Sequence, residues 1–264
     1  AVVSSASAAR HPEAAHPAAM TDTSMFTVRV PDTCTAEIEY VLHIVLGEWL
    51  ALPFHAEPGP HQHIEIERSG AVLRLDASFF QEAARNWLEE PSLPRVPLQR
   101  LTRDQVPAGI ARRLQEYVPI LPDSLPVLYG LPRIDVGDEA PHITCDIDIF
   151  GSVFFMLSRY EEAVLPERDT HDRFPARASL AYRAGLLHRP VVNEYVELLW
   201  AMMTQLWPAL KRIPREFRLV LSHDVDEPFA YARLPTGAVV RRMAGDLVKR
   251  RSPGQAVRTW KGWN

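Results

Sequence analysis

Three side chains that can bind a metal ion lie close together near the end of this 264-residue chain. His223, Asp224 and Asp226 directly follow an apolar run at residues 217–221, whose alternating pattern predicts a strand. Residues two apart in an extended chain point to the same side, so the two carboxylates repel each other unless a cation or a proton lies between them. Carboxylate and imidazole groups are ligands for zinc, manganese, iron and cobalt. The spacing therefore indicates a metal site beyond the carboxyl end of a strand.

A second interpretation explains the same residues without a metal. Ser and Asp residues after a strand often cap the next helix or form turns in which the side chain accepts a backbone N–H. An Asp-x-Asp pair is a weak motif, and its spacing alone leaves both interpretations open.

The wider sequence around the pair, LVLSHDVDEP at residues 219–228, resembles the first motif of the polysaccharide deacetylases, a carbohydrate esterase family. The resemblance implies that Asp224 is the general base and that Asp226 binds the metal, with His223 as a further candidate ligand. It implies zinc as the first choice of ion, with manganese, iron or cobalt as alternatives. The implied reaction is hydrolysis of N-acetyl groups on an acetylated amino-sugar polymer or oligosaccharide, in a distorted (β/α) barrel.

The chain departs from that family in one respect. The family completes its metal site with a His-x-x-x-His motif, but no histidine follows His223 in this sequence. Only 38 residues follow Asp226, whereas a barrel of this kind needs about 200. We therefore expect residues 214–264 to hold the first strand and helices of an incomplete, C-terminally truncated deacetylase barrel that is inactive by itself.

Composition narrows the class of protein. With 47% hydrophobic residues and a formal net charge of −4, the chain is expected to form one or two globular domains with a real core. Scattered basic residues in a net negative chain argue against nucleic-acid binding, and the cluster at 249–251 is assigned to a helix C-terminus. Cys34 and Cys145 form no C-x-x-C pair, so neither a disulfide framework nor a structural zinc site is expected.

The N-terminal 24 residues are rich in Ala, Ser and Pro, which predicts a disordered segment without a signal peptide. No apolar run approaches the roughly 20 residues of a membrane span. We expect no membrane span, and the sequence favours a cytoplasmic location.

A mixed α/β domain is expected at residues 25–213. Thr35 is the expected N-cap of a helix with an apolar stripe, which Pro53 ends. The runs 63–67 and 71–75 predict a hairpin. Further helices are expected at 108–117, 148–162 and 191–206, and a short strand at 126–130.

This domain resembles the uncharacterised region that precedes the deacetylase domain in many bacterial proteins. The matching segments are residues 148–162, 169–175 and 179–182. Together with the LVLSHDVDEP segment, the resemblance covers roughly residues 35–250. These signatures indicate an architecture and carry no known chemistry.

Other polar groups in the domain are interpreted as structural. Asp148 is expected to cap a helix rather than to bind a metal together with Asp146. His61 and His63 are interpreted as a solvated pair. Six residues that are close in sequence are expected to form a buried ion network that positions a loop on a helix; they are Arg159, Glu161, Glu162, Asp169, His171 and Arg173.

Two other functions remain open beside a hydrolase of carbon–nitrogen bonds. Glycosyltransferases also use Asp-x-Asp after a strand to hold a metal and a nucleotide sugar, although no nucleotide-binding pattern precedes the pair in this chain. Alternatively, the N-terminal domain is a non-catalytic carbohydrate-binding or docking module.

Overall fold

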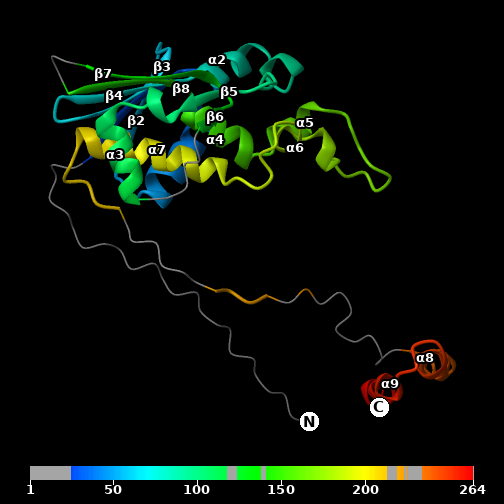
Figure 1. Cartoon of the computed structure of the whole chain (residues 1–264). Helices are drawn as coiled ribbons and strands as arrows, with labels where there is room; N and C mark the ends of the chain where they lie inside the picture. The colour runs from blue at the N-terminus through cyan, green and yellow to red at the C-terminus, as the bar shows by residue number, and fades with distance from the viewer. Residues whose placement is uncertain are drawn as a thin grey trace, which may run out of the picture. The chain divides into compact units, whose positions relative to one another are not determined.

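The computed structural model describes residues 25–117, 124–137, 141–212, 219–222, 224 and 234–263. The chain divides into two compact units, Ala1–Pro214 and Arg215–Asn264. The described part of the first unit is a mixed α/β domain (Figure 1). The expected disordered segment at residues 1–24 lies outside the described residues.

A six-stranded mixed sheet forms one layer of the first unit, in the order β2-β1-β3-β4-β8-β7. Its strands are β1 (Phe26–Pro31), β2 (Phe54–Gly59), β3 (His63–Arg68), β4 (Ala71–Asp76), β7 (Gly130–Val136) and β8 (His142–Ile147). The pairs β1–β2 and β4–β8 are parallel, and the other neighbours are antiparallel. Strands β5 (Gln99–Thr102) and β6 (Ser124–Val127) form a separate antiparallel pair.

The two faces of the six-stranded sheet differ in polarity because alternate side chains point to opposite faces. Val28, Ile66, Leu73 and Cys145 are fully buried on the inner face. On the other face Arg29 donates to Glu67 at 2.7 Å, and its guanidinium also lies near other glutamates of β2 and β3. One packed face and one polar face are typical of a largely antiparallel sheet.

Helices form the second layer. The principal ones are α1 (Thr35–Leu42), which continues as a π-helix (His43–Trp49), α3 (Ala108–Tyr117), α4 (Ile149–Leu157) and α7 (Val191–Leu206). Figure 1 shows α3, α4 and α7 on one side of the sheet. Contacts of α1 with α4, and of α4 and α3 with α7, join these helices into one layer.

Helix α7 is buried along almost its whole length, including two charged side chains. Glu194 and Glu197 are at most 3% exposed, and Arg189 and Arg212 pair with them at 2.7 and 2.8 Å. These pairs satisfy charges that burial otherwise makes costly, so α7 can sit at the centre of the domain.

Short elements complete the first unit. They are α2 (Ser78–Arg85), α5 (Tyr160–Val164), α6 (Leu180–Arg183) and three 3₁₀ turns at Glu90–Ser92, Arg103–Gln105 and Ala176–Ala178.

The described part of the second unit is a pair of helices, α8 (Thr236–Val248) and α9 (Pro253–Trp263), that pack against each other. Asp246, 2% exposed, accepts hydrogen bonds from Arg250 at 2.8 Å and from Thr259 on α9 at 2.9 Å. No closed barrel is formed by the residues that the structure describes. None of the described helices combines the length and the apolar character needed to cross a membrane.

Several expected elements are confirmed: the hairpin of β3 and β4, α3 and α7. Two helix boundaries are wrong. Cys34, not Thr35, is the N-cap of α1, and it is left-handed with no capping hydrogen bond from its side chain. The helix expected over 148–162 breaks after Leu157, because Arg159 has a φ of 54° that no α-helix accommodates, and α5 begins at Tyr160. The short strand also differs: β6 ends at Val127.

The two faces of β4 provide a test of the layered architecture. Leu73 is fully buried on the inner face, whereas its neighbour Val72 is half-buried on the polar face. We expect Leu73→Ala to lower the free energy of unfolding by about 2–5 kcal/mol, because it leaves a cavity under the helices. Val72→Ala, the matched control, is expected to cost less than about 1 kcal/mol. Urea unfolding followed by circular dichroism measures both, and equal losses would contradict the assignment of the two faces.

Candidate functional site

The carboxyl edge of the sheet brings together the starts of two helices. Strand β4 ends at Asp76 and α2 begins at Ser78, while β8 ends at Ile147 and α4 begins at Ile149. Because β4 and β8 are parallel neighbours, both strand-to-helix turns lie at the same edge, where α/β sheets usually bind ligands. The fully buried carboxylate of Asp148 lies between the two turns.

Asp148 caps both helices. Its Oδ1 accepts from the backbone N–H of Gly151 at 2.7 Å, which confirms the expected N-cap of α4. Its Oδ2 accepts from the backbone N–H of Phe79 at 2.8 Å, in the first turn of α2 and 69 residues earlier in the chain. A Cβ at position 151 would overlap with the Asp148 carboxylate and with Phe79, so the junction requires glycine there.

The protonation of Asp148 is altered by its surroundings. Burial raises the pKa of this carboxyl well above its usual value, and the neighbouring charge of Asp76 raises it further. The two backbone hydrogen bonds oppose the rise because they favour the anion. Burial is the largest of these effects.

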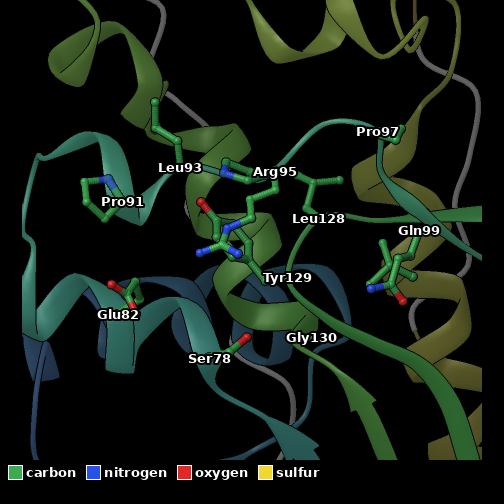
Figure 2. A pocket seen from close by; sticks show the side chains of 12 residues that line it. Ser78, Glu82, Pro91, Leu93, Arg95, Pro97, Gln99, Leu128, Tyr129 and Gly130 are labelled. Carbon is green, nitrogen blue, oxygen red and sulfur yellow. The ribbon is translucent and has the colours of Figure 1, made fainter.

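A cleft of about 310 Å³ opens beside the start of α2 (Figure 2). Its walls come from α2, from the proline-rich loop before β5, and from the turn between β6 and β7. The lining residues are Ser78, Glu82, Pro91, Leu93, Pro94, Arg95, Pro97, Gln99, Val127, Leu128, Tyr129 and Gly130.

Two tyrosines hold the proline-rich wall of the cleft in place. The hydroxyl of Tyr129 donates to the carbonyl of Ser92 at 2.8 Å, and the backbone N–H of Leu88 donates to the Tyr160 hydroxyl at 2.7 Å. The Ser92 hydroxyl donates to the carbonyl of Glu89, so Tyr160 must be the donor in its 3.0 Å contact with Ser92 Oγ. Burial raises the pKa of Tyr129, which keeps this phenol neutral.

The turn between β6 and β7 is fixed from the opposite side. Tyr195 of α7 donates to the carbonyl of Pro126 at 2.7 Å and accepts from the N–H of Leu128 at 3.0 Å. Gly130 has a φ of +85°, and a Cβ there would overlap with the Asp146 carbonyl of β8. The backbone can therefore enter β7 this close to β8 only at a glycine.

Of the three residues that the sequence selects as a metal site, the structure describes one. Asp224 is exposed to solvent. His223 and Asp226 lie outside the described residues. Across the described ranges, no three His, Cys, Asp or Glu side chains gather into a group that could hold a metal ion. The described residues thus supply one carboxylate to the expected site.

The prediction of a strand at 217–221 is wrong for residues 219–221, the part that the structure describes. Residues 219–222 form no strand, and Leu219, Val220 and Leu221 are 70%, 76% and 80% exposed. A strand forms only when its backbone N–H and C=O groups pair with a neighbouring strand, and no described strand pairs with this segment.

The expected buried ion network is also wrong in form. Arg159 forms an exposed bidentate pair with Glu162 at 2.5 and 2.7 Å, and Arg173 pairs separately with Asp169 at 3.0 Å. The partners in each pair are only three or four residues apart, so the arginines reach them from exposed positions, and no network that joins the two pairs is needed. Glu161, half-buried, instead accepts from the backbone N–H of Leu180 and so fixes α6 to α5.

The other polar groups have structural or solvent-exposed positions. Asp146 lies 3.6 Å from Arg133 on the polar face of the sheet. His63 is exposed and His61 half-buried. These positions fit the solvated histidine pair and the structural role expected from the sequence.

Sequence reasoning missed the cleft. Ser78, Tyr129 and the pair Arg95 and Gln99 come from three separate segments, and only the tertiary structure brings these segments together. The available signal was the concentration of prolines after residue 90. It indicates a loop of fixed conformation, but it does not show that the loop forms the wall of a cleft.

A family model describes most of this domain. Residues 26–208 match the family of unknown function DUF7033, and the chain belongs to that family. No curated protein and no solved structure matched the chain.

The double cap predicts a loss of stability on substitution of Asp148. In Asp148→Asn one carboxylate oxygen becomes an NH₂ group that faces a backbone N–H donor. We expect the free energy of unfolding to fall by about 1–3 kcal/mol, because one buried donor loses its acceptor. Asp146→Asn, two residues away and partly exposed, is the control and should change stability by less than about 1 kcal/mol. Equal effects in urea unfolding would contradict the double cap.

The raised pKa of Asp148 predicts a dependence of stability on pH. Between the ordinary pKa of Asp in the unfolded chain, about 3.9, and the higher pKa in the folded protein, only the folded state holds the proton. The free energy of unfolding should therefore decrease as the pH rises through that window. Asn does not titrate, so this slope should be absent from Asp148→Asn. Unfolding curves from about pH 4 to about pH 8 measure it, and identical slopes in both proteins would contradict the assignment.

Proposed function

We propose that this chain is part of a metal-dependent amino-sugar deacetylase, whose catalytic segment begins after residue 213. The observation that carries the proposal is the pair Asp224 and Asp226, two residues apart and shortly after the apolar run at 219–221. Asp224 is exposed, so water and a substrate can reach its carboxylate.

The exposed apolar side chains of this segment support an incomplete barrel. Leu219, Val220 and Leu221 are all at least 70% exposed, and large apolar side chains in a row are normally covered by neighbouring elements. On α8, Val240 and Leu247 lie two turns apart on one face and are 58% and 50% exposed. We infer that these surfaces pack against further strands and helices of a deacetylase-type (β/α) barrel, and that the run 219–221 becomes a strand only there.

The proposed roles follow from the chemistry of the side chains. Asp226 would hold the ion, with His223 as a further candidate ligand. A bound divalent ion, zinc first among the candidates, would polarise the acetyl carbonyl and lower the pKa of a bound water. Asp224 would accept the proton of that water as it attacks the carbonyl carbon, and the products would be acetate and a free amine. The proposed substrate is an acetylated amino-sugar polymer or oligosaccharide.

Two substitutions separate the proposed roles, tested in the longest natural form of the protein that contains this chain. Asp226→Ala should abolish both metal binding and acetate release from chitooligosaccharides. Asp224→Asn should keep the metal but lower the rate of acetate release by about 10²–10⁴, because an amide cannot accept the proton. Asp172→Asn, an exposed Asp in the N-terminal domain, is the control and should keep the full rate.

Metal content by mass spectrometry and acetate release by an enzymatic assay provide the two readouts. Acetate release by Asp224→Asn at the unmutated rate would contradict the assignment of the base. Unchanged metal content in Asp226→Ala would contradict the assignment of the ligand.

A further inference from the structure

The cleft beside α2 contains polar groups without partners in the part of the chain that the structure describes. Arg95 and Gln99, which line the cleft, are both exposed to solvent, and no hydrogen bond or ion pair joins either side chain to another described residue. The Oγ of Ser78 is buried and also has no hydrogen-bond partner among the described residues. Buried polar atoms nearly always have a partner, so an unpaired hydroxyl beside a cleft indicates capacity for a ligand.

The charges that line the cleft favour a neutral ligand. It has one acidic side chain, Glu82 on α2, and one basic side chain, Arg95 on the opposite wall (Figure 2). A phosphate or a nucleotide would face the carboxylate of Glu82, and a cationic ligand would face the guanidinium of Arg95. A neutral molecule with several hydroxyl groups meets neither repulsion.

The shapes of these groups favour a sugar. Carboxylate, guanidinium and primary amide groups are planar and offer two hydrogen-bonding atoms side by side, which matches two adjacent hydroxyls on a ring. The remaining walls are apolar and include Pro91, Leu93 and Pro94, against which the C–H face of a ring can pack. The volume of about 310 Å³ is near the lower end of the range for small-molecule sites and suits one ring.

The cleft is also fixed in shape before any ligand binds. The Tyr129 and Tyr160 hydroxyls hold the loop that carries Pro91 and Arg95, and Ser92 within that loop is fully buried. Tyr195 holds Leu128 on the other wall. A site whose walls are already ordered loses less conformational entropy on binding.

We propose that this cleft binds one neutral pyranose unit of an oligosaccharide. Its hydrogen-bonding groups are the unpaired hydroxyl of Ser78, the side chains of Arg95 and Gln99, and Oε2 of Glu82, whose Oε1 already accepts from Asn86. The choice of amino-sugar probes rests on the proposed deacetylase function, but binding at the cleft requires neither Asp224 nor a metal ion.

Calorimetric titration of this chain tests the proposal, with N,N′,N″-triacetylchitotriose, cellotriose and maltotriose as probes and a chelator present throughout. We expect at least one of these neutral sugars to bind. Arg95→Ala and Gln99→Ala should each weaken that binding by about tenfold, the effect of losing a hydrogen bond to a charged or polar group. Arg112→Ala, an exposed arginine on α3 outside the cleft, is the matched control and should leave the affinity unchanged.

The chelator and the Asp224→Asn variant keep this test separate from the deacetylase proposal. Full sugar affinity in Asp224→Asn would support a cleft that acts independently of the catalytic segment, whatever the outcome of the acetate assay. The proposal would be overturned if none of the three sugars bound at millimolar concentration, or if the cleft variants bound as tightly as the control. Alanine and glutamate are titrated under the same conditions. The proposal would also be overturned if either amino acid bound while none of the sugars did.

Discussion

The buried carboxylate of Asp148 is the interaction on which the arrangement of this domain depends. It accepts one backbone hydrogen bond from the first turn of α4 and one from the first turn of α2, at 2.7 and 2.8 Å. The first four N–H groups of any helix lack intrahelical partners, and inside a domain such donors need an acceptor. One side chain here satisfies two helices that are 69 residues apart in the chain. Removing it would leave unpaired donors in both.

The position of α2 determines the surroundings of the cleft. The ring of Phe79 packs against the rings of Phe80, Tyr129, Phe154 and Tyr160, at centroid distances of 5.0 to 5.6 Å. Two of those rings, Tyr129 and Tyr160, carry the hydroxyls that hold the proline-rich wall. One connected structure therefore joins the Asp148 junction, the aromatic cluster and the wall of the cleft. This support keeps the wall in place and the cleft open.

Local patterns in the sequence were sufficient to predict part of this fold. The periodicity of α3 and α7 and the alternation of β3 and β4 depend on residues close together in the chain, and both kinds of element were found. The cap at Asp148 was also predicted, but only for α4. Its second partner, Phe79, depends on the parallel pairing of β4 with β8, which no local pattern encodes.

The same distinction separates the two candidate sites. Asp224 and Asp226 were selected because they are neighbours in sequence and resemble a known motif, and the structure adds only that Asp224 is exposed. The cleft assembles Ser78, Arg95 and Tyr129 from distant segments, and none of them has a distinctive sequence context. Residues 219–221, the described part of the expected strand, form no strand, because alternation of apolar residues specifies a strand only where a partner strand is present, and no described strand pairs with them.

Amide hydrogen exchange measured by NMR tests the central claim, that Asp148 joins α2 to α4 and so orders the wall of the cleft. In the unmodified protein the amides of Phe79 and Gly151 should exchange as slowly as those of the core strands, because both are buried hydrogen-bond donors. In Asp148→Asn at least one of the two should exchange faster, because one of these donors loses its acceptor, and the amide of Leu88, which donates to Tyr160, should exchange faster with it. Fast exchange of Phe79 and Gly151 in the unmodified protein, or unchanged exchange in the variant, would contradict the account.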